Sequence, residues 1–324
     1  MAPPDSSPWD ALKGWHNGTE SLAINNTRGC RLLTRAAVRL TTLFLPRAWC
    51  RDGPCVYISK HLLVKTGPLT HLQEAATMKF VADNTSGVPV PKVHCAFVYE
   101  DRAYIVMERI QGESLPRAWR RLESDPAALA KIFKQLRRIM QELRSLKPPT
   151  DAGVQSCTGG SLYDSRNTRA FPRMGPFQTV HDFHTWLRDS LDPSEGKPEN
   201  WHEDEQDWQD LIEMAALQDG SWPAPVFTHG DLNPSNIFVR GDEVVGIIDW
   251  ETAGWYPIYW EYTSAWTVSI NNEGWQNTLD QFLEPHPEAL KMERTRQRWW
   301  GKFDTVTPCT MDRTVLFSVM CAGL

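Results

Sequence analysis

Residues 227–237 have the sequence FTHGDLNPSNI, and a second run at residues 246–250 has the sequence GIIDW. Turn formers surround Asp231 in the first run, so we expect this carboxylate on a tight loop that follows a short strand. Two strands with a short turn between them are expected to connect the runs. Since such a hairpin brings its two ends together, Asn236 and Asp249 are expected to face one small volume.

These three side chains form a set with specific chemistry. A carboxylate on a loop orients and deprotonates a hydroxyl. An amide oxygen and a second carboxylate are hard ligands that hold magnesium against a nucleoside triphosphate. We therefore predict Asp231 as the catalytic base and Asn236 and Asp249 as magnesium ligands. The alternative, a simple turn at Asp231 and a strand-end cap at Asp249, requires three positions to match in spacing by accident.

This motif resembles the protein-kinase-like phosphotransferases, and most closely their aminoglycoside phosphotransferase and choline kinase branch. The family's catalytic loop maps onto residues 229–236, and its second metal-binding aspartate maps onto Asp249. The branch replaces the arginine of the protein-kinase His-Arg-Asp triplet, and Gly230 stands at that position here. The resemblance implies a structural role for His229. Residues 175–183 resemble a recurring feature of fungal-type members.

The resemblance extends upstream to a strand and a helix. Residues 61–65 predict a strand that ends at Lys65. A helix follows, with Glu74, Met78 and Val81 spaced to share its inward face. The resemblance implies that Lys65 and Glu74 form an ion pair that positions the α- and β-phosphates of ATP.

Details of this region give further expectations. Thr70 and Gln73 form a capping box that predicts the start of the helix. Lys60 lies on the same predicted hairpin as Lys65, and it would replace Lys65 if the strand register were shifted. The ion pair between Lys65 and Glu74 is expected to be partly exposed between two lobes.

The nucleotide would also contact a hinge. Residues 103–108 predict an apolar strand, and the resemblance implies that the linker after it binds adenine through the carbonyl of Glu108 and the amide of Ile110. Protein kinases cover the phosphates with a glycine-rich loop before the lysine strand. In this chain the nearest glycine upstream of Lys65 is Gly53, so no substitute for that loop is evident.

Composition limits the class of protein. The chain has 324 residues, 41% of them hydrophobic, which suffices for one large or two modest domains. The net charge is −6 and no long basic run occurs, so we expect no nucleic-acid partner. No apolar stretch is long enough to span a membrane, so no membrane partner is expected. Seven scattered cysteines and the lack of a secretion signal at residues 1–8 favour reduced thiols and a cytoplasmic location.

We expect an α+β, two-lobed protein-kinase-like fold. Residues 1–112 would form a small β-rich N-lobe, in which residues 1–40 are not assigned, and residues 113–324 would form a mainly helical C-lobe. Pro126 is predicted to begin a long amphipathic helix. Residues 150–178, rich in Gly, Ser, Pro and Asp, predict a surface loop.

The expected reaction is transfer of the γ-phosphate of ATP, with Mg²⁺, to a hydroxyl of a small molecule. Only residues 250–256 separate Asp249 from Pro257, which leaves no platform for an extended peptide. The aromatic residues that follow Asp249 could line an acceptor pocket or form core, and the sequence leaves both open. The alternative function is a catalytically weak, kinase-like nucleotide-binding protein. Neither reading identifies the acceptor or the oligomeric state.

Overall fold

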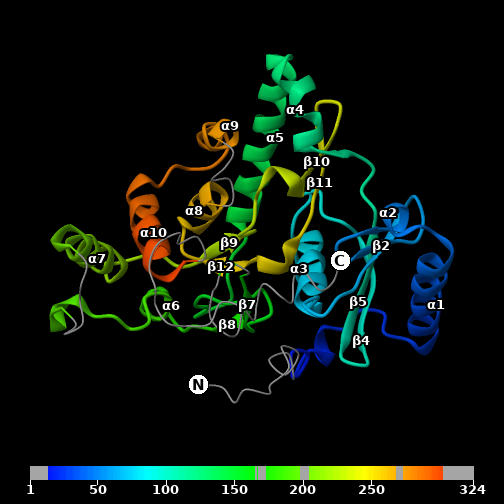
Figure 1. Ribbon diagram of the computed structural model, residues 1–324, viewed down its shortest axis with the longest axis horizontal. Coiled ribbons are helices and arrows are strands. Elements are labelled where there is room, and N and C mark those ends of the chain that lie inside the picture. The colour runs from blue at the N-terminus through cyan, green and yellow to red at the C-terminus, as the bar shows by residue number, and fades with distance from the viewer. Residues whose placement is uncertain (1–13, 165, 167–172, 198–203, 268–272, 302–324) are drawn as a thin grey trace.

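A computed structural model describes residues 14–164, 166, 173–197, 204–267 and 273–301. Figure 1 shows a small sheet-rich lobe on one side and a larger, mainly helical lobe on the other. The expected α+β, two-lobed architecture is therefore confirmed. The expectation about residues 1–8 lies outside the described residues.

The small lobe is built on a five-stranded antiparallel sheet with the order β1-β2-β3-β5-β4. Alternating burial along β5 is what a strand with one face on a core requires. The bounds of the strands are β1 Arg51–Asp52, β2 Cys55–Tyr57, β3 Leu62–Lys65, β4 Val93–Tyr99 and β5 Arg102–Glu108.

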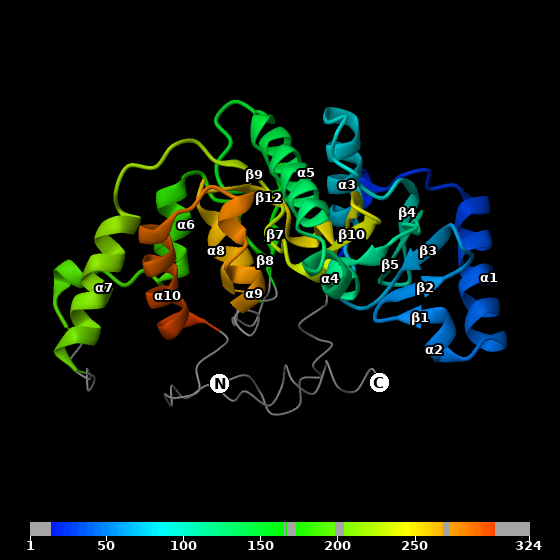
Figure 2. The same ribbon diagram turned by 90° about the horizontal axis from the view of Figure 1, so that it is seen from above.

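Helices lie on both sides of this sheet. Figure 2 shows α3 on the side that faces the large lobe and α1 on the outer side. The helical segments of this lobe are η2 Glu20–Leu22, α1 Arg28–Phe44, α2 Arg47–Cys50 and α3 Leu72–Asn84.

The predicted start of α3 is wrong by one residue. Helix α3 has His71 as its N-cap, and the Nδ1 atom of His71 accepts a hydrogen bond of 3.1 Å from the amide of Gln73. Thr70 is therefore not the cap, because an imidazole nitrogen replaces the hydroxyl that the capping-box pattern requires.

The large lobe contains the remaining elements. Its strands are β6 Glu113–Ser114, β7 Leu162–Tyr163, β8 Arg173–Met174, β9 Val226–Thr228, β10 Ile237–Arg240, β11 Glu243–Ile247 and β12 Gly254–Tyr256. Its α-helices are α4 Leu115–Glu123, α5 Pro126–Ser145, α6 Val180–Leu187, α7 Glu205–Gln218, α8 Trp260–Thr267, α9 Glu273–Gln276 and α10 Pro287–Trp300. Its 3₁₀ turns are η3 Pro193–Glu195, η4 Pro234–Asn236, η5 Trp250–Thr252 and η6 Leu279–Gln281.

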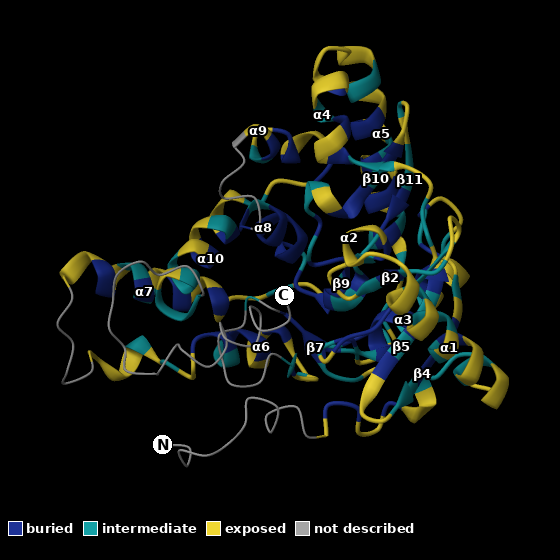
Figure 3. Ribbon diagram, turned by 45° about the vertical axis from the view of Figure 1, so that its right-hand side comes forward, coloured by how far each residue is buried: buried dark blue, intermediate teal, exposed yellow. Residues whose placement is uncertain are grey.

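Helix α5 confirms the predicted amphipathic helix and its first residue, Pro126. Its apolar face is buried in a core that continues from α3 and the small sheet to β9, β11 and α8. A second core joins α6, α7 and α10 to β12 and the start of α8. Figure 3 shows these buried faces turned inward, with exposed residues on the outer surfaces.

The expectation of a surface loop at residues 150–178 is wrong for the described part of that segment. Val154, Leu162 and Met174 are buried, and Leu162 pairs with Met174 in the β7–β8 hairpin. The backbone of Gln155 also exchanges hydrogen bonds with Trp255, at 2.8 and 3.2 Å. The polar composition of this segment predicted a loop. A few apolar residues that pack against the core are nevertheless enough to order its described part.

The five-stranded sheet ends at Glu108, whereas the next strand, β6, pairs with β10 of the large lobe. We keep residue 112 as our proposed boundary between the lobes, because Gly112 lies in this connection. Its missing Cβ leaves room for the backbone of Val239, which would be 2.8 Å from such an atom. Within the described ranges, no helix combines the length and the hydropathy needed to cross a membrane.

Candidate active site

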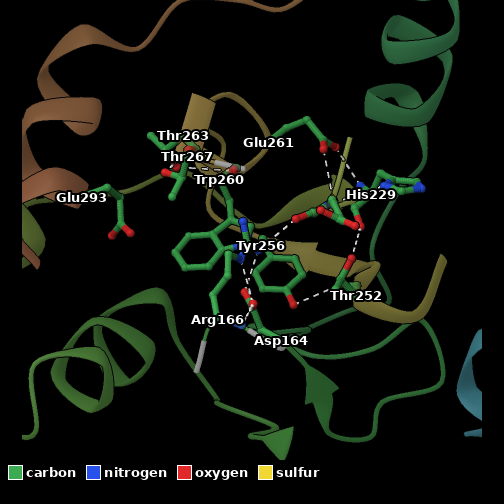
Figure 4. Close-up of polar contacts among 12 residues, drawn as sticks. Asp164, Arg166, His229, Thr252, Tyr256, Trp260, Glu261, Thr263, Thr267 and Glu293 are labelled. Atoms are coloured by element: carbon green, nitrogen blue, oxygen red, sulfur yellow. Dashed lines mark hydrogen bonds and ion pairs between the residues drawn. The ribbon is translucent and has the colours of Figure 1, made fainter. Parts of the chain in front are cut away.

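One buried carboxylate fixes the backbone of the loop that follows β9. Glu261, in the first turn of α8, accepts hydrogen bonds from the amides of His229 (2.7 Å) and Gly230 (3.1 Å). Figure 4 shows Glu261 directed at this loop. The ring of His229 is buried and donates from Nε2 to the carbonyl of Ile248 at 3.0 Å. These contacts suit the structural role that the resemblance implies for His229.

Gly230 meets a conformational requirement of the loop. Its φ is +81°, and an added Cβ would lie 3.2 Å from the carbonyl oxygen of Thr252 and 3.3 Å from its hydroxyl. That hydroxyl is itself fixed, because it donates to the carbonyl of His229 at 2.8 Å. An arginine at residue 230 would be both strained and crowded, which explains the departure from the protein-kinase triplet.

The carboxylate of Asp231 is oriented by two amides. Its Oδ2 atom accepts hydrogen bonds from Asn236 (3.0 Å) and Asn233 (3.2 Å). Asn236 also donates to the backbone carbonyl of Asp231 at 2.8 Å. Burial raises the pKa of Asp231, although Arg166 and His229 oppose the shift. The structure therefore brings Asp231 and Asn236 into direct contact.

An ion pair between Asp164, which is buried, and Arg166, which is largely buried, lies beside the loop. Arg166 donates to both carboxylate oxygens of Asp164, at 2.7 and 2.6 Å, and to the carbonyl of Gly230 at 2.9 Å. Burial alone would lower the pKa of Arg166, but Asp164 and Asp231 raise it, so its positive charge is secure. Figure 4 shows this pair next to Tyr256.

The β10–β11 hairpin carries Asp249 to the same place, as expected. Ile237 pairs with Ile247, and the amide of Ile248 donates to the carbonyl of Asn236 at 3.0 Å. Asp249 follows with φ +65° and ψ 62°, a left-handed conformation that L-residues other than Asn and Asp rarely adopt. Such strain is concentrated at functional sites.

Lys65 connects the two lobes through three carboxylates. Its Nζ atom lies 2.9 Å from Glu74, 2.7 Å from Asp249 and 3.1 Å from Glu251. The expected ion pair between Lys65 and Glu74 is therefore present. It is not partly exposed, however, because the side chains of Lys65 and Glu74 are only 8% and 2% exposed. The strand pair β2–β3, helix α3 and the η5 turn enclose it.

Lys65 and its three carboxylate neighbours shift one another's pKa values. Burial would lower the pKa of Lys65, but its three carboxylate neighbours raise that pKa well above its ordinary value. The opposite balance holds at Asp249, where Lys65 outweighs burial and lowers the pKa. Burial raises the pKa of Glu74 to about 8, against the effect of Lys65, and burial also raises that of Glu251. At neutral pH a Glu74 carboxyl with this pKa is largely protonated, so the charge of Lys65 is balanced mainly by Asp249.

This donor set suits a divalent cation. Oxygen atoms of Glu74, Asp249 and Glu251 lie within 4.8 Å of one another, as a metal site requires. Hard carboxylate oxygens are the ligands that Mg²⁺ prefers. The amide nitrogen of Asn236 is used in hydrogen bonds to Asp231, so any metal held by Asn236 would meet its amide oxygen. Asn236 and Asp249 remain our predicted ligands, and Glu251 is a further candidate.

The turn between β1 and β2 lies next to Lys65. The sequence shows no glycine-rich loop that would cover the phosphates at this position. Strand β2 places Cys55 opposite Lys65, and the carbonyl of Pro54 accepts a hydrogen bond of 2.9 Å from the amide of Thr66. Gly53 in this turn has φ +51° and open space around its Cβ position. Burial raises the pKa of the Cys55 thiol to about 12, so this cysteine is a neutral neighbour of Lys65.

The hinge residues lie between the lobes. Glu108 ends β5 opposite Leu62, and the amide of Arg109 donates to the carbonyl of His61 at 2.8 Å. The side chain of Ile110 packs against Gly246 of β11, where an added Cβ would be only 2.8 Å from it. The predicted adenine contacts of Glu108 and Ile110 remain predictions.

The aromatic residues after Asp249 belong to the core. Five of them are at most 3% exposed: Trp250, Trp255, Tyr256, Tyr259 and Trp260. Tyr256 donates to the carbonyl of Thr252 at 3.0 Å, and its ring stacks on Trp260. Of the two readings left open by the sequence, the structure favours core packing over a pocket wall.

Four residues of the site are absent from the predicted set: Glu251, Glu261, Asp164 and Arg166. Glu251 carries a local signal, since an acidic residue two positions after Asp249 shares its tight turn. The others lie 30 or more positions from Asp231 on separate elements, so no spacing pattern in one sequence connects them to it.

Comparison with known proteins gives a family and a fold. A family model described as a phosphotransferase enzyme family matches residues 63–293. No curated protein matches the chain. A thermostable mutant of aminoglycoside phosphotransferase APH(4)-Ia in its apo form is similar in structure, with a TM-score of 0.51 and 14% identity over 75% of this chain and 78% of that chain.

Two further solved structures are similar. Another thermostable mutant of APH(4)-Ia, in a ternary complex with AMP-PNP and hygromycin B, has a TM-score of 0.50 and 15% identity, over 72% of this chain and 76% of that chain. Choline kinase LicA from Streptococcus pneumoniae has a TM-score of 0.46 and 15% identity, over 83% and 89% of the two chains. The two APH(4)-Ia structures show that the fold is kinase-like.

Proposed function

Because the chain belongs to the phosphotransferase enzyme family, we propose that it transfers the γ-phosphate of ATP to a hydroxyl of a small molecule, with Mg²⁺. One observation carries the proposal. Asp231 and Asn236 are hydrogen-bonded to each other, and the backbone of Asn236 is bonded to the hairpin end that delivers Asp249 to Lys65. Groups that suit a base, a metal and a phosphate are thus gathered from both lobes.

Asp231 is the proposed catalytic base. Its Oδ2 atom is held by Asn233 and Asn236, so its orientation is fixed before an acceptor arrives. A pKa raised by burial makes the carboxylate a stronger proton acceptor. Arg166 donates a hydrogen bond to the carbonyl of Gly230. Its positive charge favours the ionised form of Asp231 and so opposes the rise in pKa that burial causes.

Lys65 is proposed to bind the α- and β-phosphates, with Glu74 fixing its direction. Asn236 and Asp249, with Glu251 as a further candidate, would hold Mg²⁺, which when bound would neutralise phosphate charge. The ammonium of Lys65 bonds to Asp249 and Glu251 and limits the repulsion between them. Binding of Mg-ATP would exchange some of those bonds for phosphate contacts.

The nucleotide base is proposed to meet the backbone of Glu108 and Ile110 at the hinge. The Gly53–Pro54 turn would cover the phosphates in place of a glycine-rich loop, because it is bonded to the residue that follows Lys65. A solved structure with this fold holds AMP-PNP and hygromycin B, which supports ATP as donor and a small hydroxylated compound as acceptor. The five described cysteines are free thiols, which supports the proposed cytoplasmic location.

The proposal is tested by incubating the protein with γ-labelled ATP and fractionated metabolite extracts. We expect a labelled low-mass product that depends on Mg²⁺ and disappears in Asp231→Asn. Asp242→Asn is the matched control, because Asp242 is a carboxylate in the exposed turn between β10 and β11. ATP binding without any labelled product would instead favour the alternative of a catalytically weak nucleotide-binding protein.

A further inference from the structure

Helix α1 places its apolar side chains toward solvent. Eight large apolar side chains are exposed among the described residues, and seven of them lie between Leu32 and Trp49. The exposed fraction reaches 73% at Leu33 and 77% at both Phe44 and Trp49. We define the α1 stripe as Leu32, Leu33, Leu40, Leu43, Phe44, Leu45 and Trp49. Soluble proteins rarely expose so many contiguous apolar side chains without a partner.

The inward face of α1 is the more polar one. Thr34 is buried, and its hydroxyl lies 3.8 Å from the sulfur of Cys95 on β4. The guanidinium of Arg35 lies 3.5 Å from the centre of the Tyr99 ring, also on β4. The helix is thus fixed on the sheet by polar and cation–π contacts, and these contacts turn its leucines outward.

The segment that carries the α1 stripe is positively charged. Residues 21–51 contain six arginines and no Asp or Glu, whereas the whole chain has a net charge of −6. Arg28 and Arg39 are exposed and lie about three helical turns apart, so they share one edge of the stripe. These arginines are too scattered in sequence to form a basic run, and the helix gathers them.

The position of α1 leaves the α1 stripe accessible. Figures 1 and 2 show α1 and α2 at the outer end of the small lobe, with the sheet between them and the large lobe. Figure 3 shows exposed residues along this end. A partner could therefore approach without touching the candidate active site.

Charge decides among the possible partners. A symmetric contact between two copies would set the same patch against itself and bring like-charged arginines together. The partner should instead be anionic, with an apolar layer for the leucines, Phe44 and Trp49. A basic helix with Leu, Phe and Trp on its other face suits the boundary between lipid headgroups and acyl chains. We propose that the α1 stripe and its arginines dock this protein on an anionic lipid surface.

This proposal revises the expectation of no membrane partner. That expectation rested on the lack of a segment that could span a bilayer, and a helix lying in the interface needs no such segment. The cytoplasmic leaflet carries anionic lipids, so the docking agrees with the proposed cytoplasmic location.

The test is flotation of the full-length protein with phosphatidylcholine vesicles that contain or lack phosphatidylserine. We expect binding to the anionic vesicles, little binding to the neutral ones, and loss of binding at high salt. An arginine near an anionic surface strengthens binding about five-fold. Arg28→Gln/Arg39→Gln should therefore weaken the partition coefficient about 25-fold.

Matched variants separate the surface from general effects. Leu40→Glu/Phe44→Glu should abolish vesicle binding, while Leu217→Glu changes an exposed leucine on α7 and should not. Arg117→Gln/Arg120→Gln removes two exposed arginines of α4 and should leave binding intact. Thermal unfolding of each variant checks that the fold is retained.

Three outcomes would overturn the proposal. The first is absence of binding to anionic vesicles at low salt. The second is an α1-dependent dimer by light scattering that binds no vesicles, which would assign the α1 stripe to a second copy. The third is equal binding to soluble polyglutamate that Leu40→Glu/Phe44→Glu does not weaken, which would assign the arginines to an acidic protein segment.

Discussion

Two amides fix the orientation of the Asp231 carboxylate. Burial raises its pKa, although Arg166 and His229 oppose the shift, so Asp231 is suited to accept a proton. We expect Asp231→Asn to lower kcat by about 10²- to 10⁴-fold, the usual contribution of a general base. Nucleotide binding should survive, since the amide keeps the size of the side chain. Steady-state kinetics and an ATP thermal shift check both statements. Near-normal turnover in a folded Asp231→Asn variant would contradict the assignment.

Asp249 combines a charge with a left-handed backbone, and two variants separate these properties. Asn tolerates this conformation, so Asp249→Asn removes mainly the charge, whereas Asp249→Ala adds about 1–2 kcal/mol of backbone strain. Both should abolish Mg²⁺-dependent binding of ATP and weaken the ion pair with Lys65, and Asp249→Ala should lower the melting temperature more than Asp249→Asn, because only alanine adds the backbone strain. Asn236→Ala should weaken binding less, because it removes a neutral ligand.

Thermal shifts at saturating Mg-ATP measure this difference. A ligand at 100 times its Kd stabilises a protein by about 2.7 kcal/mol, and that shift should vanish in Asp249→Asn. An unchanged shift would place the metal elsewhere, with Glu74 and Glu251 as the remaining carboxylates of the cluster.

At the residue scale, the sequence predicts those site residues that belong to one local pattern, such as a strand end or a helix face. Lys65 and Glu74 were placed by a strand end and a helix face, and their ion pair is present. Arg166 could not be predicted, because it reaches the loop from a polar segment 64 residues before Gly230. Glu261 looks like an ordinary helical glutamate until its contacts with the loop amides are seen.

At the scale of elements, the Lys65–Glu74 pair links β3 to α3. Because both side chains are buried, the volume-matched variants Lys65→Met and Glu74→Gln are better tests than alanine. Each should raise the KM for ATP or lower kcat, and Glu74→Gln should do so more weakly. The double mutant should be less than additive, with a coupling of about 0.5–3 kcal/mol.

Lys60→Ala is the control for this cycle, since Lys60 is exposed in the connection between β2 and β3. It should leave both kinetic constants unchanged. Full additivity of Lys65→Met and Glu74→Gln would refute the pair as a functional unit. A defect in Lys60→Ala equal to that of Lys65→Met would show that the two lysines have been assigned the wrong way round.

The start of α3 should be sensitive to acid. Burial, Arg173 and His16 lower the pKa of His71 to about 3, and its neutral Nδ1 atom is the N-cap acceptor. The folded state therefore prefers neutral His71. The contribution of His71 to the free energy of unfolding is complete above pH 6.5 and is lost as the pH falls toward 3. Between pH 6.5 and 5 the loss is about 1–2 kcal/mol.

Asn is a good N-cap that does not titrate, so His71→Asn should have a shallower loss of stability between pH 7 and 5 than the wild type. His94→Asn, at an exposed histidine of β4, is the control and should keep the wild-type slope. Thermal melts at several pH values measure the slopes. Equal slopes in His71→Asn and the wild type would remove His71 as the titrating cap.

For the whole molecule, periodicity predicted the main helix, and the family resemblance predicted the two-lobed fold. The family match confirms the predicted branch. The failures have physical reasons. Residues 150–178 look like a loop because few of them are apolar, yet Gln155 pairs with Trp255 of β12 at a distance that no local pattern reveals. Helix α1 was not predicted as a surface, because only its orientation on the sheet turns ordinary leucines outward.

The segment that follows Asp249, residues 250–260, determines which class of acceptor can reach Asp231. Residues 254–256 form β12, which pairs with β9 directly before the catalytic loop, and α8 begins at Trp260. This segment is almost entirely buried, so it offers no free edge to an extended peptide. Gly230 also removes the arginine that would bind an activation-loop phosphate. We therefore expect a small acceptor and no switch by phosphorylation.

A competition experiment tests this directly. The protein receives γ-labelled ATP with a mixture of a peptide library and a metabolite extract, and Asp231→Asn is run in parallel. Label should appear in the low-mass fraction only, at a rate that falls at least about 100-fold in the variant. Labelled Ser, Thr or Tyr in the peptides, without a low-mass product, would contradict the expectation. It would mean that a segment other than residues 250–260 docks the peptide, because those residues are held in β12 and α8.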